Sequence, residues 1–410
     1  MLRDDLILKL NDTKKKKRLS GAVKLGKLIK KEEKRKVRRA CCGFIHSAYS
    51  FSPYTPAMAA YMAYNNGLSC AGMVDTGTLA GGEEFLSVCR ILGVSGAVGV
   101  GYTTLLPKPY RKLCNIFSRD YKHFVYLAAF GIPENAYGKM DKFLISYRAE
   151  REECNRKILA QINSQFRGLG VISYEEDVLE GTKAIEGGAV TRSHVMLALA
   201  KRVIKMAGTG TALVDYLTKV QKISLSTREE KLLLSASNIN YEYDLCAILT
   251  KKLKVDDEKY TSKIHQFTGA TLAAGGLVFY PLNEKDVVEG GEKYIDELIA
   301  TLKQLSVHGV AYQATSVTAH LPYLEDRLLE NGLMGIDGNN IHSTRDVLFT
   351  GMMTPLQEKC FYALVGNAYL AGMDPMDAFY GPRTESRLPA FSDRLRVFEE
   401  VGKKLAKEAE

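Results

Sequence analysis

Residues 69–101 read SCAGMVDTGTLAGGEEFLSVCRILGVSGAVGVG, and this stretch decides the fold. Two short apolar runs, residues 69–74 and 95–100, flank a segment with helical periodicity at residues 79–92. Gly93 follows that segment directly, and glycine is typical of the carboxyl end of a helix. Buried strands that alternate with helices of roughly ten to fifteen residues indicate parallel βα units. We therefore expect a strand, a covering helix and a second, parallel strand.

The same alternation continues on both sides of this stretch. Further buried strands are expected at residues 41–45, 277–280, 309–313 and 333–336, with helical patterns between them. Residues 138–262 interrupt the alternation with amphipathic helical patterns and many charges, which predicts a helical insertion. About six or seven βα units split by an insertion favour an α/β fold, a distorted TIM-like (β/α)7 barrel, over an open sheet.

Five segments follow from this pattern. They are a basic helical N-terminal extension (residues 1–39), the first part of the barrel (40–137), the helical insertion (138–262), the second part of the barrel (263–385) and a C-terminal helical tail (386–410). In a barrel of parallel strands, functional side chains lie where strands end and loops begin. Those ends are His46, Asp75 with Thr76, residues 99–103, Tyr280 with Pro281 and residues 337–342.

The first forty residues carry most of the positive charge. They contain sixteen Lys or Arg against five Asp or Glu, whereas the whole chain of 410 residues has a net charge of +9. A basic helical segment of this kind can contact nucleic acid or an anionic surface. Leu6, Leu10 and Leu25 belong to apolar stripes that instead favour a pair of helices packed on the protein, with the lysines in solvent. No aromatic residue lies among these charges, so the packed pair is the favoured interpretation.

Several classes of protein are excluded by composition and motifs. No apolar run reaches the roughly eighteen residues that a transmembrane helix needs. The eight cysteines include no CxxC pair, so reduced thiols and a cytoplasmic location are expected. No GxSxG elbow, Walker loop or dinucleotide-binding glycine fingerprint is present between a strand and a helix.

Five short motifs at the expected strand ends and helix starts form an ordered pattern. They are Phe-Ile-His at residues 44–46, Asp-Thr-Gly-Thr at 75–78, Gly-Val-Gly at 99–101, Arg-Ser-His at 192–194 and Asn-Ile-His at 340–342. In order and spacing the pattern resembles the polymerase-and-histidinol-phosphatase (PHP) superfamily, whose motifs are His-x-His, Asp-His-Asp-Thr/Ser, Gly-Val/Ile-Glu, Arg-Pro-His and Asp-x-His. The resemblance covers roughly residues 40–345 and implies a barrel of the PHP type.

The PHP resemblance implies a centre of two or three divalent metal ions that hydrolyses phosphoesters. This sequence departs from the superfamily at most of the metal-ligand positions, which here are Phe44, Thr76, Gly101 and Asn340 and, on looser alignments, Tyr126 and Tyr280. His46, Asp75 and His342 keep side chains that can bind metal. With one carboxylate and two imidazoles, these three residues could hold at most one divalent ion, such as Mn, Zn, Fe or Mg.

Three functional hypotheses remain open. The leading one is a PHP-type protein that has lost most of its polynuclear metal site and binds a phosphorylated small molecule, without catalysis or with weak catalysis. In the PHP superfamily the residues that match Arg192 and His194 face the substrate phosphate, and Asn340 could add an amide contact. The alternatives are an active metal-dependent phosphoric ester hydrolase with one metal ion, and a nucleic-acid-associated protein that uses residues 1–39.

Overall fold

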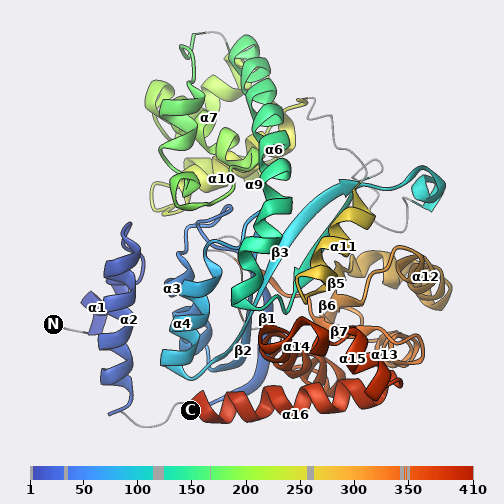
Figure 1. Ribbon diagram of the computed structural model, residues 1–410. Helices are drawn as coiled ribbons and strands as arrows, with labels where there is room; N and C mark the ends of the chain where they lie inside the picture. Colours follow the sequence, from blue (N-terminus) through green and yellow to red (C-terminus); the bar gives the residue numbers. More distant parts are fainter. Residues whose placement is uncertain are drawn as a thin grey trace. The chain divides into compact units, whose positions relative to one another are not determined.

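The computed structural model describes residues 3–31, 36–113, 124–166, 168–255, 263–341, 346, 348 and 351–409. It divides into two compact units, which are described separately below. The first unit contains Met1–Ile145 and Tyr260–Glu410, and the second is Ser146–Lys259. Figure 1 shows the helices and strands of both units in chain order. Within the described ranges, no helix is both long enough and apolar enough to cross a membrane.

Eight strands form one sheet in the first unit, in the order β7–β6–β5–β4–β3–β2–β1–β8. The strands are β1 (Arg38–Ile45), β2 (Leu68–Thr76), β3 (Ser95–Leu105), β4 (Phe124–Phe130), β5 (Leu277–Pro281), β6 (Gly309–Tyr312), β7 (Met334–Asp337) and β8 (Asn340–Ile341). The strands expected from the apolar runs are confirmed close to their expected positions, although β3 continues to Leu105.

The two edges of this sheet meet. β7 and β8 are separated only by Gly338 and Asn339, yet β7 pairs with β6 whereas β8 pairs with β1 at the opposite edge. The Phe44 backbone N–H donates to the Asn339 carbonyl oxygen at 3.0 Å, so a hydrogen bond joins β1 to the segment that follows β7. The sheet is therefore curled into a barrel-like form (Figure 1). This confirms the predicted α/β fold with a curled, TIM-like sheet, while its assignment to the PHP type stays a prediction.

β4 differs from the predicted pattern of parallel strands. It is antiparallel to both β3 and β5, with Thr103 opposite Tyr126 and Gly101 opposite Ala128. In the described part of the connection between β3 and β4 there is the short 3-10 helix Lys108–Leu113, and an antiparallel pair of strands needs no crossover helix. The expectation of uniformly parallel βα units is therefore wrong at β4. As a result, the first residues of β4 lie beside the carboxyl ends of its neighbours.

Several helices pack on the first unit's sheet and its connections. They are α3 (Pro56–Asn65), α4 (Gly82–Leu92), α11 (Ile264–Ala273), α12 (Glu284–Gln304) and α13 (Leu321–Glu330). The start of α3 is fixed by Thr55, whose hydroxyl oxygen accepts from the Met58 N–H at 3.2 Å, and by Pro56 in the first turn. α4 ends at Gly93, whose φ of 66° is left-handed, as the sequence predicted.

The N-terminal extension forms two helices, α1 (Arg3–Lys9) and α2 (Lys15–Ile29). Leu6, Leu10 and Leu25 are buried, and α2 packs against α4. The interpretation of a packed helical pair is therefore confirmed. A partner for the lysines on its outer face stays a prediction.

Three helices close the amino-terminal end of the parallel strands: α14 (Pro355–Met373), α15 (Pro382–Arg387) and α16 (Phe391–Ala409). α14 packs against α16 and β7, and Phe361 and Phe398 are buried in one core with strand residues. The Asn367 side-chain amide donates to the carbonyl oxygens of Gly131 (3.0 Å) and Gly275 (2.7 Å), which follow β4 and precede β5. Residues 386–410, expected as a tail, thus contribute Leu395 and Phe398 to the core.

The second unit is helical. Its main helices are α7 (Arg192–Ala207), α8 (Thr211–Asp215), α9 (Thr227–Leu234) and α10 (Tyr241–Lys252), and α6 (Tyr137–Gln165) begins in the first unit and continues into it. α7 packs against α10, and Leu199 and Leu245 are fully buried. Among its described residues there is no strand, and the unit lies within the insertion predicted at residues 138–262.

Candidate active-site region at the carboxyl ends of the strands

The structure brings several of the predicted positions to one end of the sheet. Thr76, the last residue of β2, pairs with Gly101 in β3. Phe44 near the end of β1 pairs with Asn340 in β8. Because β4 is antiparallel, Tyr126 near its start lies at this same end. The sequence therefore located this end of the barrel correctly.

Asp75 is held by neighbouring serines. Its carboxylate accepts hydrogen bonds from the Ser47 N–H (2.7 Å), the Ser47 hydroxyl (2.5 Å) and the Ser50 hydroxyl (2.7 Å). Burial raises the pKa of Asp75, and these hydrogen bonds oppose that rise. Both carboxylate oxygens thus already have donors, and these three hydrogen bonds leave about one of the four lone-pair sites of the carboxylate for a metal ion.

Of the two predicted histidine ligands, the structure describes His46 only. His46 is half-buried directly after β1, and its backbone N–H donates to the Ile341 carbonyl oxygen at 2.8 Å. His342 lies outside the described residues, so a metal site formed by His46, Asp75 and His342 stays a prediction. Asn340 is exposed in β8, and its role in ligand binding is likewise untested.

Phe44 belongs to the packed core. Its ring meets Phe130 edge-on with centroids 5.3 Å apart, and Phe130 meets Phe279 in the same way at 5.9 Å. All three rings are buried and come from β1, β4 and β5. Such edge-to-face contacts stabilise buried aromatic clusters. The position that carries a metal-binding histidine in the PHP superfamily is here occupied by a core hydrophobe.

The Tyr126 side chain fills the space that a side chain at position 101 would occupy. A Cβ atom placed on Gly101 would overlap the hydroxyl oxygen of Tyr126 and crowd its ring. The two residues lie on adjacent strands, two residues out of register, since Tyr126 pairs with Thr103 and Gly101 pairs with Ala128. A glutamate at position 101 cannot coexist with the Tyr126 side chain where it stands. The Tyr126 side chain in this position therefore requires a glycine at position 101.

Tyr280 points to the other face of the sheet. Successive side chains of a strand alternate between faces, so Phe279 and Tyr280 of β5 point in opposite directions. Phe279 contacts Phe130, whereas the Tyr280 hydroxyl is hydrogen-bonded to Tyr294 of α12. Burial raises the pKa of the Tyr280 phenol. The structure does not bring Tyr280 together with Phe44, and a one-residue offset in the looser alignment accounts for this.

A group of polar side chains at the ends of β5, β6 and β7 was not assigned a role from the sequence. Asp337 is buried, and this burial, together with the charge of Glu284, raises its pKa to about 7. The Asn339 N–H donates to Asp337 at 3.1 Å, the Gln313 N–H donates to Glu284 at 3.1 Å, and the Gln313 amide donates to the Asn339 oxygen at 3.3 Å. The signal in the sequence was an acid placed directly after an apolar strand.

Arg192 and His194 stand at the start of α7 in the second unit. The His194 ring nitrogen Nδ1 accepts from the Thr191 backbone N–H at 3.0 Å, which caps the helix. Burial lowers the pKa of His194 to about 4, so the ring is neutral at neutral pH. A neutral ring adds no positive charge to attract a phosphate. Phosphate binding by Arg192 and His194 therefore stays a prediction, with Arg192 as the charged partner.

Among the described residues, the strand ends offer no clustered set of metal ligands. In the described part of the chain, no three His, Cys, Asp or Glu side chains are grouped so that they could hold a metal ion. Phe44 and Gly101 offer no donor atoms, and the oxygens of Asp75 are already bonded to serines. The expectation of at most one divalent ion rests on His342 and is not tested.

A cavity of about 830 Å³ lies elsewhere, at the amino-terminal end of the strands. It is lined mostly by apolar residues of α4, β3, α14 and α16, among them Leu86, Gly96, Ala368 and Leu405. Among the described residues, the charged side chains that line it are Arg90 and Glu134, which pair with each other at 2.6 Å, and Glu408. We place the candidate site at the opposite end because the buried carboxyl groups and the sequence motifs are there.

Comparisons with known proteins give distant structural likenesses. No protein-family model and no curated protein sequence matches the chain. A solved putative metal-dependent phosphoesterase from Bifidobacterium adolescentis is 16% identical with a TM-score of 0.49, and the match covers 77% of this chain and 92% of that one. An amidohydrolase from Chromobacterium violaceum, solved with bound sulfate and no metal, is 16% identical with a TM-score of 0.48 over the same shares. Likenesses at this level assign no function to this chain.

Proposed function

We propose that this protein is a binding protein built on a PHP-type barrel, in which packed side chains have replaced the polynuclear metal centre. Its ligand is a phosphorylated small molecule, bound without hydrolysis. The proposal joins the sequence resemblance to the geometry of the strand ends.

The packing of two aromatic rings supports the proposed loss of the metal centre. The Tyr126 hydroxyl lies where the side chain of residue 101 would begin, and the Phe44 ring packs on Phe130. Both positions carry metal ligands in the PHP superfamily, and here both are filled by aromatic rings. A ligand side chain at position 101 would require the Tyr126 ring to leave, whereas a ligand at position 44 would replace the Phe44 ring itself.

The ligand class rests on the resemblance and on Arg192. The motif at residues 192–194 is similar to a PHP segment that faces substrate phosphate. Arg192 supplies a permanent positive charge at the start of the 16-residue helix α7, where a helix amino terminus also favours anions. A phosphorylated ligand would use this charge, whereas its dephosphorylated counterpart would not.

Metal content and turnover test the proposal first. Protein purified without chelator is analysed for bound metal and assayed with Mn²⁺ on generic phosphomonoesters. We expect well under one equivalent of metal and no turnover. One tightly bound metal with turnover that disappears in His46→Ala, but not in the exposed control His265→Ala, would establish the one-metal hydrolase instead.

Ligand binding is tested by thermal unfolding in the presence of sugar phosphates and nucleotides, each paired with its dephosphorylated form. We expect a rise in Tm with at least one phosphorylated compound only, because a ligand that binds the native state stabilises it. Arg192→Gln removes the charge and abolishes that rise. A rise that persists in Arg192→Gln, or that appears equally with the dephosphorylated partner, contradicts the proposed ligand class.

A further inference from the structure

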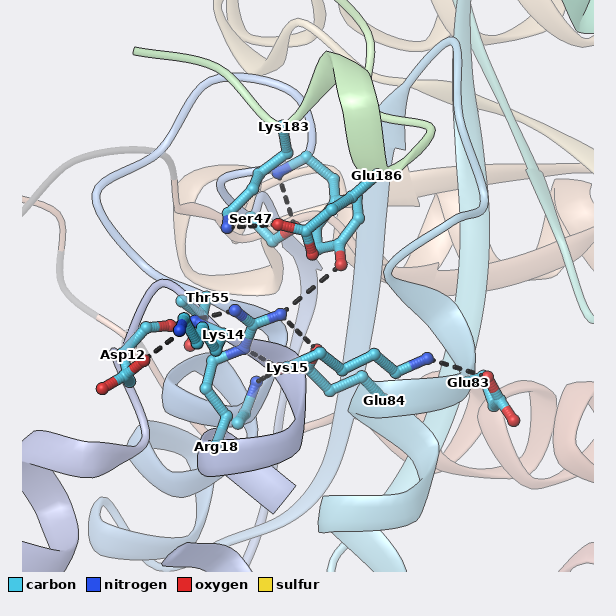
Figure 2. Close-up of polar contacts among 12 residues, drawn as sticks. Asp12, Lys14, Lys15, Arg18, Ser47, Thr55, Glu83, Glu84, Lys183 and Glu186 are labelled. Carbon is cyan, nitrogen blue, oxygen red and sulfur yellow. Dashed lines mark hydrogen bonds and ion pairs between the residues drawn. The ribbon is translucent and has the colours of Figure 1, made fainter. Parts of the chain in front are cut away.

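The N-terminal helices are fixed to the first unit by a buried ion pair. The Arg18 guanidinium donates from Nε and Nη2 to the two carboxylate oxygens of Glu84 at 2.8 and 2.7 Å (Figure 2). Both side chains are completely buried. Nη1 of Arg18 donates to the carbonyl oxygens of Asp12 and Thr13, and Glu84 also accepts from the Ala57 N–H. This bidentate geometry sets the orientation of α2 on α4.

Further contacts surround this pair. Lys15 pairs with Glu83 at 2.9 Å, and the Asn11 side chain exchanges hydrogen bonds with the Thr55 N–H and the Pro53 carbonyl. Figure 2 shows the Lys15–Glu83 and Arg18–Glu84 pairs reaching from α2 to α4. The extension is therefore a fixed part of the surface, and one side of α2 always faces outward.

That outward side carries a set of lysines that we call the lysine face. It consists of Lys16, Lys24 and Lys27 of α2 and of Lys30 and Lys31 directly after the helix. The three lysines of the helix recur at spacings of eight and three residues and so lie on one side of it. All five are exposed, and in the described part of the chain none has an ion-pair partner. α2 contains no Asp or Glu.

The lysine face is not explained by the stability of the helix. Lysines near a helix carboxyl end interact favourably with the helix dipole, which accounts for Lys27 and Lys30. Lys16 lies in the first turn, where the dipole opposes a positive charge. Like charges three or four residues apart, such as Lys24, Lys27 and Lys31, repel one another. An anionic partner would remove both costs.

The other exposed side chains of these helices favour a lipid surface over nucleic acid. Val23 and Leu28 of α2 are 44% and 36% exposed among the lysines, and Leu8 of the neighbouring helix α1 is 72% exposed. The lysine face contains no aromatic ring for base stacking and no arginine for bidentate phosphate contacts. Lysines with interspersed aliphatic side chains are suited to anionic headgroups and the upper acyl region of a bilayer.

We propose that the lysine face docks this protein on an anionic lipid surface. The five lysines contact the headgroups, and Leu8 and Val23 contact the bilayer beneath them. Attachment is peripheral and reversible, because it rests on charge and a few aliphatic side chains. The proposal is independent of the function proposed for the barrel.

Vesicle sedimentation tests it with the full chain. Phosphatidylcholine vesicles with and without phosphatidylserine are compared at about 0.1 M and at about 0.5 M salt, since salt screens charges over distances of roughly 10 Å at the lower concentration. We expect binding to the phosphatidylserine vesicles at low salt, little at high salt, and none to phosphatidylcholine alone. Equal binding to both vesicle types, or no binding to either, overturns the proposal.

Matched variants locate the surface. Lys24→Gln, Lys27→Gln and Lys31→Gln together weaken vesicle binding at least about tenfold. Lys359→Gln, Lys404→Gln and Lys407→Gln together remove the same charge from exposed positions of α14 and α16 and leave binding unchanged. Circular dichroism and thermal unfolding confirm that both triple variants are folded. Equal losses in the two variants would mean that net charge alone attracts the protein, which overturns the docking surface.

Two further experiments distinguish a lipid partner from a nucleic-acid partner. Leu8→Ser with Val23→Ser weakens vesicle binding about threefold without changing its salt dependence. A short DNA duplex and a single-stranded RNA are tested in parallel by filter binding. Tight, salt-dependent binding to either nucleic acid, with weak vesicle binding and no effect of the serine variant, overturns the lipid assignment in favour of a nucleic-acid partner.

Discussion

The carboxyl end of the barrel has two unlike sides. On the side formed by β1 to β4, Phe44 packs on Phe130, Tyr126 covers Gly101, and the Asp75 carboxylate accepts three hydrogen bonds. On the side formed by β5 to β7, the buried Asp337 accepts from the Asn339 N–H, its single donor among the residues that the structure describes. Burial alone therefore does not make a carboxyl group reactive. The number of hydrogen-bond donors around a buried carboxyl group decides whether its ionised form is stabilised or destabilises the folded protein.

The largest loss of unfolding free energy is expected from a substitution at Phe44, on the side formed by β1 to β4. Phe44→Ala removes a buried ring from an aromatic cluster and should lower the free energy of unfolding by about 4 kcal/mol. Urea unfolding measures this, with Phe51→Ala as a control because that side chain is only half-buried. A loss below about 1 kcal/mol would mean that Phe44 borders an open cavity, and the comparison between the two sides would fail.

Asp75 should come next. Asp75→Ala leaves the N–H of Ser47 and the hydroxyls of Ser47 and Ser50 without their acceptor, and should cost about 3 kcal/mol of unfolding free energy. Asp326→Ala, at an exposed position of α13, should change it by less than about 0.5 kcal/mol. A small loss at Asp75 together with lost metal binding would instead make Asp75 a ligand.

Gly101 and Tyr126 should show strong coupling. Gly101→Ala places a methyl group against the Tyr126 hydroxyl and should cost about 2 kcal/mol. In a Tyr126→Ala background the same change should cost less than about 1 kcal/mol, because the overlapping ring is gone. A double-mutant cycle from urea unfolding gives the coupling energy. Additive effects would show that the two residues do not compete for one space.

A substitution at Asp337 should raise the free energy of unfolding instead of lowering it, and by the smallest amount of the four. Its folded-state pKa of about 7 is raised above the usual value of 3.8, so the folded protein favours the protonated acid. The stability this contributes is present below about pH 4 and is lost as pH rises through about 7. Asp337→Asn should flatten this decline and stabilise the protein at pH 8 by about 1 to 2 kcal/mol. Stability curves against pH for both proteins measure it, and unchanged slopes would show that Asp337 ionises normally.

The sequence predicted the strands and their ends, since apolar runs and strand-end residues are local signals, while the site at those ends stays a prediction. It did not predict the direction of β4, because no local pattern says which way a strand runs once the crossover helix is missing. Nor did it predict the face of Tyr280, where a shift of one residue reverses the side chain. The pKa of Asp337 depends on Glu284 and on burial by segments distant in the chain.

The short joint between β7 and β8 also bears on how the chain becomes a closed barrel. The Cys42 thiol donates to the carbonyl oxygen of Asn339, 297 residues further along the chain. During synthesis β1 emerges early, but its outer edge has no partner until β8 has been made. In the meantime this edge is an open template for other strands. Ring closure should therefore be a late and slow folding step, and the stage at which the nascent chain is most prone to aggregation.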